Sequence, residues 1–173
     1  MIFVTVGTHE QPFNRLIQKV DELKRDGVIK DDVLMQTGFS TYEPKYCRWQ
    51  RLFPFSEMKA NIKDARIVIT HGGPSSFIMP LQEGKTPIVV PRIAKFHEHV
   101  NDHQLDFALA VNKRYKNLIV VENVDDLAEI ITNYDGLVKN MNTGALNNNA
   151  VFNEKFEKIV DKLFNHTGGT NEN

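Results

Sequence analysis

The sequence predicts an α/β protein built on a doubly wound parallel sheet, and two patterns support this class. Short segments rich in β-branched residues recur along the chain at 2–6, 32–36, 66–70, 87–91 and 117–121. Apolar residues are consecutive in these segments rather than alternating, which is typical of strands covered on both faces of a parallel sheet. Amphipathic segments separate them, and strand–helix alternation at this spacing gives right-handed βαβ units.

The helices are expected between these strands. The first follows a turn at 7–12, and its apolar residues recur at helical spacing, namely Phe13, Leu16, Ile17, Val20 and Leu23. Further helices are expected over 57–65, 75–83, 100–112 and 124–133, with a short additional strand within 48–53. Because Pro80 falls inside one of these helices, we expect that helix to be kinked or to start late.

The last part of the chain is expected to lie outside the sheet domain, which spans 1–139. Residues 140–150 are Asn-rich and are predicted to form a loop, and the polar, Gly-rich residues 165–173 are predicted to be disordered. Between them, 151–164 predict an amphipathic helix with one apolar stripe, made of Phe152, Phe156, Ile159, Val160 and Leu163. This stripe suits either docking to another protein or packing against the chain's own sheet.

Composition narrows the class of protein further. With 173 residues, 41% of them hydrophobic and 25% charged, the chain suits one soluble globular domain. A net charge of −1 argues against a nucleic-acid binder, and the one cysteine, Cys47, fits a reducing compartment. We find no signal peptide and no run of about 20 apolar residues, so a cytoplasmic location is expected.

Three polar loops each follow a predicted strand directly. They are "GTHEQPF" at 7–13, "HGGPSS" at 71–76 and "PRIAKFHEHVNDHQ" at 91–104. The carboxyl ends of parallel strands share one edge of a sheet, where ligands of open α/β sheets bind. The sequence therefore predicts one crevice lined by all three loops.

The first two loops suit a phosphate group. Gly7 permits a tight turn at the start of 7–13, although a plain strand-to-helix turn explains this loop equally well. Gly72 and Gly73 remove side chains where the chain leaves a strand, and Ser75 and Ser76 place hydroxyl groups at the next helix start. Such a loop can hold a diphosphate without lysine or metal, whereas its structural alternative is a Gly–Gly turn capped by serine.

The third loop raises the question of a metal centre. His97, His99, Asp102 and His103 carry groups that bind Zn²⁺, and their spacing approaches the His-x-His-x-Asp-His pattern of metallo-β-lactamase-like hydrolases. One extra residue separates His99 from Asp102, so the pattern fails and no metal is expected. The remaining interpretations are a solvated helix start and a loop that reads polar hydroxyl groups, through Glu98, Asp102, His103 and Gln104.

The strings G-T-H-E-Q-P-F, H-G-G-P and E-H-V-N-D-H-Q occur in this order along the chain. With them the sequence resembles the C-terminal, donor-binding half of GT-B glycosyltransferases, a Rossmann-like domain of the glycosyltransferase family 28 type. It is similar to the small catalytic subunits of split glycosyltransferases. These include bacterial exopolysaccharide and capsule β-1,4-galactosyltransferases and the soluble subunit of the dolichol-linked UDP-GlcNAc transferase.

The resemblance implies roles for residues at matching positions. It implies donor diphosphate or nucleotide binding by Gly7, Thr8, His71, Gly72, Gly73, Ser75 and Ser76, with Phe55 and Met58 beside the base. It implies donor-sugar binding by Asp102, His103 and Gln104. Many relatives carry a ribose-binding glutamate at the position of Met79, and this departure affects the expected ribose contact.

The resemblance also implies an activity and a partner. We expect a two-component, inverting transferase that moves a hexose from a UDP-sugar to a lipid-linked saccharide, with galactose favoured and glucose or GlcNAc as alternatives. A membrane-associated acceptor-domain subunit would recruit the chain to the inner face of the membrane. The catalytic base would be His9, Glu10 or a residue of that partner, without cofactor or bound metal. The competing hypotheses are a metal-dependent hydrolase and a non-catalytic nucleotide-sugar-binding subunit.

Overall fold

The fold is described here from a computed structural model, which covers residues 1–139 and 141. The predicted loop at 140–150, helix at 151–164 and tail at 165–173 lie outside the described residues, apart from Met141. Within the described part of the chain, no helix is both long and apolar enough to span a membrane.

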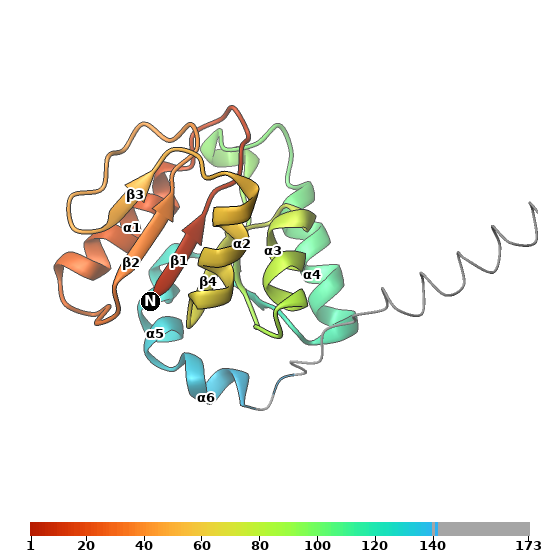
Figure 1. Ribbon diagram of the computed structural model, residues 1–173. Coiled ribbons are helices and arrows are strands. Elements are labelled where there is room, and N and C mark those ends of the chain that lie inside the picture. Colours follow the sequence, from red (N-terminus) through yellow and green to blue (C-terminus); the bar gives the residue numbers. More distant parts are fainter. Residues whose placement is uncertain (140, 142–173) are drawn as a thin grey trace, which may run out of the picture.

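A six-stranded sheet, parallel throughout, forms the centre of the molecule (Figure 1). Its strands are β1 Ile2–Thr5, β2 Val33–Gln36, β3 Arg48–Gln50, β4 Ile67–His71, β5 Ile88–Val90 and β6 Ile119–Val120. Their spatial order is β3-β2-β1-β4-β5-β6, so the chain winds outward from β1 in one direction and then from β4 in the other. This order confirms the predicted doubly wound, Rossmann-like α/β class and places the switch point between β1 and β4.

Helices cover both faces of this sheet. They are α1 Asn14–Arg25, α2 Phe55–Asp64, α3 Pro74–Gln82, α4 His103–Tyr115, α5 Leu127–Thr132 and α6 Tyr134–Val138, with short 3₁₀ turns at Ala94–Phe96 and Val124–Asp126. Successive β1 side chains point to opposite faces, so Ile2 and Val4 pack with α1 and α5, whereas Phe3 packs beside Ile62 of α2. α3 and α4 cover the same face as α2, over Val89 of β5 (Figure 1).

Three helix predictions need correction. α4 begins at His103 rather than at residue 100, because the preceding residues form a loop that leaves the 3₁₀ turn through a left-handed His97, with φ 57°. The helix expected over 124–133 is divided into a 3₁₀ turn and α5, and α6 follows it. α3 starts at Pro74 and contains Pro80, so the late helix start expected from Pro80 is wrong. A proline at the first helical position suits its fixed φ.

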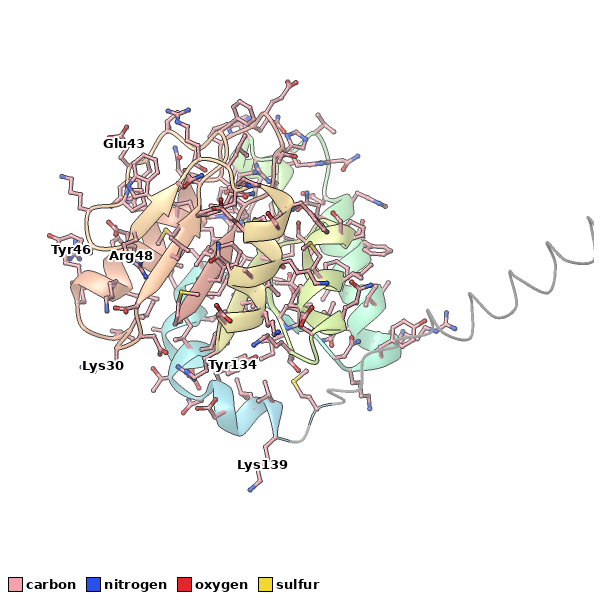
Figure 2. The ribbon with its side chains drawn as sticks, in the orientation of Figure 1. Lys30, Glu43, Tyr46, Arg48, Tyr134 and Lys139 are labelled. Carbon is pink, nitrogen blue, oxygen red and sulfur yellow. The ribbon has the colours of Figure 1, made fainter. Side chains whose placement is uncertain are left out.

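α6 is attached to the amino edge of the sheet. The hydroxyl of Tyr134 donates to the carbonyl of Thr86 at 2.6 Å, just before β5. Nη1 of Arg66, just before β4, donates to the carboxylate of Asp135 at 3.2 Å. Figure 2 shows Tyr134 and Lys139 at this edge, opposite to the edge where the three polar loops lie.

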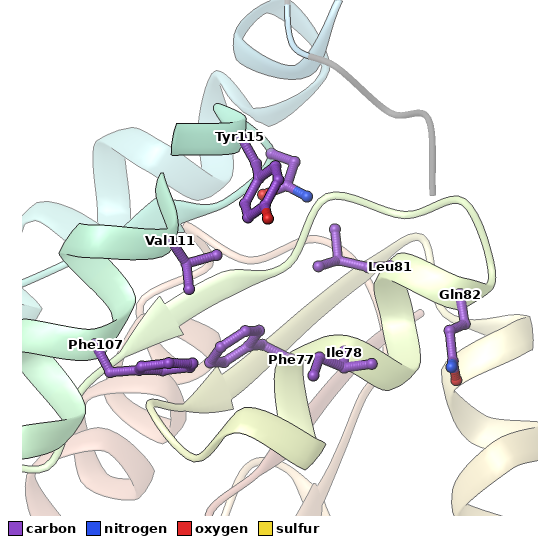
Figure 3. Close-up of a pocket in the computed structure, with 8 residues that line it drawn as sticks. Phe77, Ile78, Leu81, Gln82, Phe107, Val111 and Tyr115 are labelled. Carbon is purple, nitrogen blue, oxygen red and sulfur yellow. The ribbon is translucent and has the colours of Figure 1, made fainter. Parts of the chain in front are cut away.

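A cavity of about 290 Å³ lies between α3 and α4 (Figure 3). Its walls are mostly apolar, and Phe77 of α3 and Phe107 of α4 point toward one another with ring centroids 5.9 Å apart. Because its lining offers few polar groups, this cavity does not suit a charged or polyhydroxylated ligand.

Candidate functional site

A cavity of about 450 Å³ opens at the carboxyl edge of the sheet, at the switch point between β1 and β4. Its lining residues come from five segments that are far apart in sequence, and they are Thr5, Gly7, Thr8, His9, Gln36, Phe53, Phe55, Met58, His71, Ser75, Ser76, Met79 and Gln104. All three predicted segments therefore contribute to one crevice, although 91–104 contributes Gln104 alone.

Gln36 joins two walls of this crevice. Its side-chain amide donates to Thr5 Oγ1 at 3.2 Å and to the carbonyl of Gly7 at 3.4 Å. Its Oε1 accepts the N–H of Phe53 at 3.2 Å, so the loop after β1 and the start of the α2 segment share one support. Gln36 was not among the predicted site residues. Its signal is a polar residue that ends an otherwise buried strand.

His71 organises the loop after β4. Its Nδ1 accepts the N–H of Gly73 at 3.0 Å, and its Nε2 lies 2.7 Å from Ser76 Oγ. Burial, reinforced by the charge of Arg92, lowers the pKa of His71 to about 4, so the ring is neutral at pH 7. The single ring proton then lies on Nε2 and is donated to Ser76 Oγ. The hydroxyl proton of Ser76 is left to point into the cavity that Ser76 lines.

The glycines of this site are required by the ring of His71. A Cβ atom on Gly73 would lie 2.9 Å from Nδ1 of His71 and closer still to its Cε1. Gly7 adopts φ 74°, and a Cβ there would also collide with the His71 ring. Only glycine lets both segments approach His71 this closely, and both glycine N–H groups are bonded within the protein, that of Gly7 to Thr5 Oγ1 and that of Gly73 to His71 Nδ1.

Gln104, in the first turn of α4, supports the same loop from the other side. Its Oε1 accepts the N–H of Gly72 at 3.0 Å and the N–H of Arg92 at 3.2 Å. The side chain is buried yet lines the cavity. Because Oε1 already accepts two backbone N–H groups, Gln104 would contact a ligand through its side-chain N–H groups.

His9 lies in the cavity wall, whereas Glu10 is exposed and is not one of the lining residues. His9 Nδ1 accepts the N–H of Gln11 at 3.2 Å, and its ring centroid lies 4.9 Å from that of His99. Burial lowers the pKa of His9, with further lowering by Arg92 and His99. The neutral ring therefore carries its proton on Nε2 and acts as a hydrogen-bond donor on that side.

Three residues that were predicted to bind the donor sugar lie outside the cavity lining. The carboxylate of Glu98 is buried and paired with Arg15 at 2.9 Å, and it also accepts the N–H of Ile93. Asp102 Oδ1 accepts the N–H of Ala94 at 2.7 Å. His103 is exposed, with its ring 6.2 Å from that of Phe107.

The histidines of the third loop diverge from one another. His97 ends the 3₁₀ turn, His99 packs against His9, and His103 faces Phe107. Among the residues that the structure describes, no group of three His, Cys, Asp or Glu side chains could hold a metal ion. The hydrolase hypothesis therefore finds no candidate centre in residues 1–139.

Comparison with known proteins gives the family. The model of the glycosyltransferase family 28 C-terminal domain matches residues 1–163. Among curated proteins none matches the chain. A similar solved structure is that of the glycosyltransferase SnogD from Streptomyces nogalater, with a TM-score of 0.45 and 17% sequence identity. That match covers 80% of this chain and 37% of SnogD. Because the family model matches nearly the whole sequence, the chain belongs to the glycosyltransferase family 28 C-terminal-domain family.

Proposed function

We propose that the protein binds a UDP-sugar in the crevice and is the donor-binding, catalytic subunit of a two-component inverting glycosyltransferase. The observation that carries this proposal is the meeting of Gly7, His71 and Ser76 in one cavity at the switch point of a parallel sheet. Family membership supports transfer of a sugar from a nucleotide donor. The resemblance described above favours galactose as that sugar.

The diphosphate is proposed to lie at the start of α3. Ser75 and Ser76 line the cavity there. Pro74 has no N–H and the N–H of Ser76 donates to the carbonyl of Gly73 at 3.0 Å, so the backbone donor proposed for the diphosphate is the N–H of Ser75. The oriented hydroxyl of Ser76 adds a further donor. As the glycosidic bond breaks, negative charge grows on the departing diphosphate, and fixed donors at this point stabilise it. This arrangement uses no cofactor and no bound metal.

The nucleoside is proposed to lie along the opposite wall. Phe53, Phe55, Met58 and Met79 give this part of the cavity an apolar surface that suits a base. Phe55 is 74% exposed, so its ring is available to a ligand. Met79 lines the same cavity without a hydrogen-bonding group for the ribose, which leaves ribose recognition to neighbouring polar groups.

His9 is proposed to donate a hydrogen bond to the donor rather than to act as the base. To take a proton at Nε2 it would need the other tautomer and would lose its bond from the N–H of Gln11. Glu10 is exposed and lies outside the cavity lining. We therefore assign the general base to the acceptor-binding partner.

The partner is proposed to be a membrane-associated subunit that binds a lipid-linked saccharide at the inner face of the membrane. The matching family is a C-terminal domain. We propose that the acceptor-binding domain belongs to the partner. Two large apolar side chains are strongly exposed, namely Phe55, which lines the crevice, and Val100, at 77%, in the loop between the 3₁₀ turn and α4. A second domain that closes over the crevice would cover them.

Binding of UDP provides the direct test, with Gly73→Ala as the variant. A methyl group at this position collides with the His71 ring, and overpacking of this kind costs about 1–3 kcal/mol, so UDP affinity should fall by about tenfold. Gly136→Ala is the matched control, because a Cβ there meets nothing within 4 Å. Isothermal titration calorimetry and thermal melting would measure both. If millimolar UDP alters neither the melting temperature nor the spectra of the unmodified protein, the proposed function is wrong.

A further inference from the structure

We propose that Arg92 is an electrostatic positioning residue, whose buried charge attracts the diphosphate of the donor from behind the wall of the crevice. This inference rests on the proposed function and deepens it. It concerns a residue that does not line the cavity and that the sequence analysis did not assign.

Arg92 is fully buried and is surrounded by neutral acceptors. Its Nη1 donates to the carbonyls of Gln11 at 2.7 Å and Glu98 at 3.1 Å, and its Nη2 donates to the carbonyl of Val6 at 2.9 Å. The guanidinium carbon lies 4.9 Å from the centroid of the Phe13 ring. In the described part of the chain no carboxylate hydrogen-bonds to Arg92, although a buried charge is usually paired in this way.

The nearest carboxylate is already engaged by another arginine. Glu98 accepts from Arg15 Nε and Nη2, both at 2.9 Å, and from the N–H of Ile93 at 3.1 Å. Arg15 is itself largely buried, with 16% of its side chain exposed. Two guanidinium groups thus share one carboxylate, and the group of Arg15, Arg92 and Glu98 carries one positive charge in excess.

Other acidic groups in this region face water. Glu10 belongs to the loop over Arg92 and is exposed, and Asp102 is exposed beside Ala94. Solvent screens such charges far more strongly than it screens a buried one. Burial lowers the pKa of Arg92 to about 10, and Glu98 opposes this effect, so Arg92 remains charged at pH 7.

The excess charge lies directly behind the crevice. Val6 and Gln11, whose carbonyls Arg92 holds, flank the segment that contributes Gly7, Thr8 and His9 to the lining. The backbone N–H of Arg92 is bonded to Gln104, which also lines the cavity. The same charge contributes to the lowered pKa of both His9 and His71, after burial. A field that opposes a second cation at these rings also favours an anion there.

Calorimetry with UDP and with uridine separates this electrostatic role from a structural one. Uridine contacts the base-binding wall but carries no charge, so the ratio of the two affinities isolates the phosphate contribution. Arg92→Met should weaken UDP binding by about tenfold and leave uridine binding unchanged, because one nearby unit charge is lost. Arg92→Lys, which keeps the charge, should restore the ratio.

Glu98→Gln is expected to change UDP affinity in the opposite direction. It tests the inference even if the Arg92→Met variant does not fold. It keeps an acceptor for Ile93 and removes the one carboxylate of the group, so UDP affinity should rise by about three- to tenfold, most clearly at low salt. A purely structural role predicts that Arg92→Met and Glu98→Gln either weaken UDP and uridine in parallel or leave the ratio unchanged, and this result would overturn the inference. Absence of any UDP binding by the unmodified protein would instead overturn the proposed function and the inference with it.

Discussion

Replacing Asp21 by alanine is expected to destabilise the protein by about 2–4 kcal/mol, although Asp21 lies far from the crevice. Its carboxylate, buried on α1, accepts the N–H groups of Lys45, Tyr46 and Cys47 at 2.8–3.0 Å and the hydroxyl of Tyr42 at 2.9 Å. Without Asp21 these donors lose their shared acceptor, and the segment that leads into β3 loses its attachment to α1. Urea unfolding followed by circular dichroism would measure the change.

The same carboxylate predicts a pH dependence of stability. Burial alone would raise the pKa of Asp21, but the hydrogen bonds from Lys45, Tyr46, Tyr42 and Cys47 lower it below its ordinary value. The resulting stabilisation is complete above the unfolded-state pKa of about 3.9 and is lost as pH falls through the lower folded-state value. The stability advantage over Asp21→Asn should therefore shrink below about pH 4.

Asp26→Ala is the matched control for both measurements. Asp26 follows α1 and is exposed, and its carboxylate pairs with Arg25 at the surface. Its removal should change stability by less than about 1 kcal/mol. Equal stability of the Asp21→Ala and Asp26→Ala variants would contradict the role assigned to the buried carboxylate.

Replacing Gln104 by alanine is expected to remove UDP binding and to cost about 2–4 kcal/mol of stability. The substitution leaves the buried N–H groups of Gly72 and Arg92 without their shared acceptor. The loop that carries His71 and Ser76 thereby loses its hydrogen bond to the first turn of α4. Calorimetry with UDP and urea unfolding would measure the two effects.

Gln104→Glu separates the two roles of this side chain. It keeps an oxygen for both backbone N–H groups, but it replaces the remaining N–H groups by a negatively charged oxygen at the cavity. We expect stability close to that of the unmodified protein together with weakened UDP binding. Tight UDP binding by Gln104→Ala would refute the positioning role of Gln104.

The strands could be predicted from sequence because a two-sided parallel sheet requires consecutive apolar residues, which 2–6 and 66–70 display. The connection after α5 could not. Tyr134 is buried because its hydroxyl meets the carbonyl of Thr86, 48 residues earlier in the chain, and local periodicity contains no trace of that contact. α6 was missed for this reason. The burial of Asp21 could not be predicted either. A charged residue on a helix is expected to be exposed, and the segment that covers Asp21 lies more than 20 residues further along the chain.

The position of the crevice could be predicted for the residues that the sheet topology places. Gly7 comes just after β1, His71 ends β4 and Ser76 lies in the first turn of α3, so parallel topology alone brings them together. Glu98 was grouped with Gln104 because they are close in sequence. The left-handed turn at His97 precedes Glu98, whose carboxylate meets Arg15, 83 residues away. Sequence spacing within a loop does not show which side chains face the ligand.

The central position of β1 has a consequence for the order in which the protein assembles. β1 is made first, yet it pairs with β2 and β4, whose residues lie 31 and 65 positions later in the chain. The crevice also needs Gln104, so its walls are complete only when more than half of the chain has folded. Such non-local pairing forms slowly compared with helices. Ligand binding at the crevice therefore reports on the finished sheet, and it distinguishes a fully assembled molecule from a partly folded one that already has helical structure.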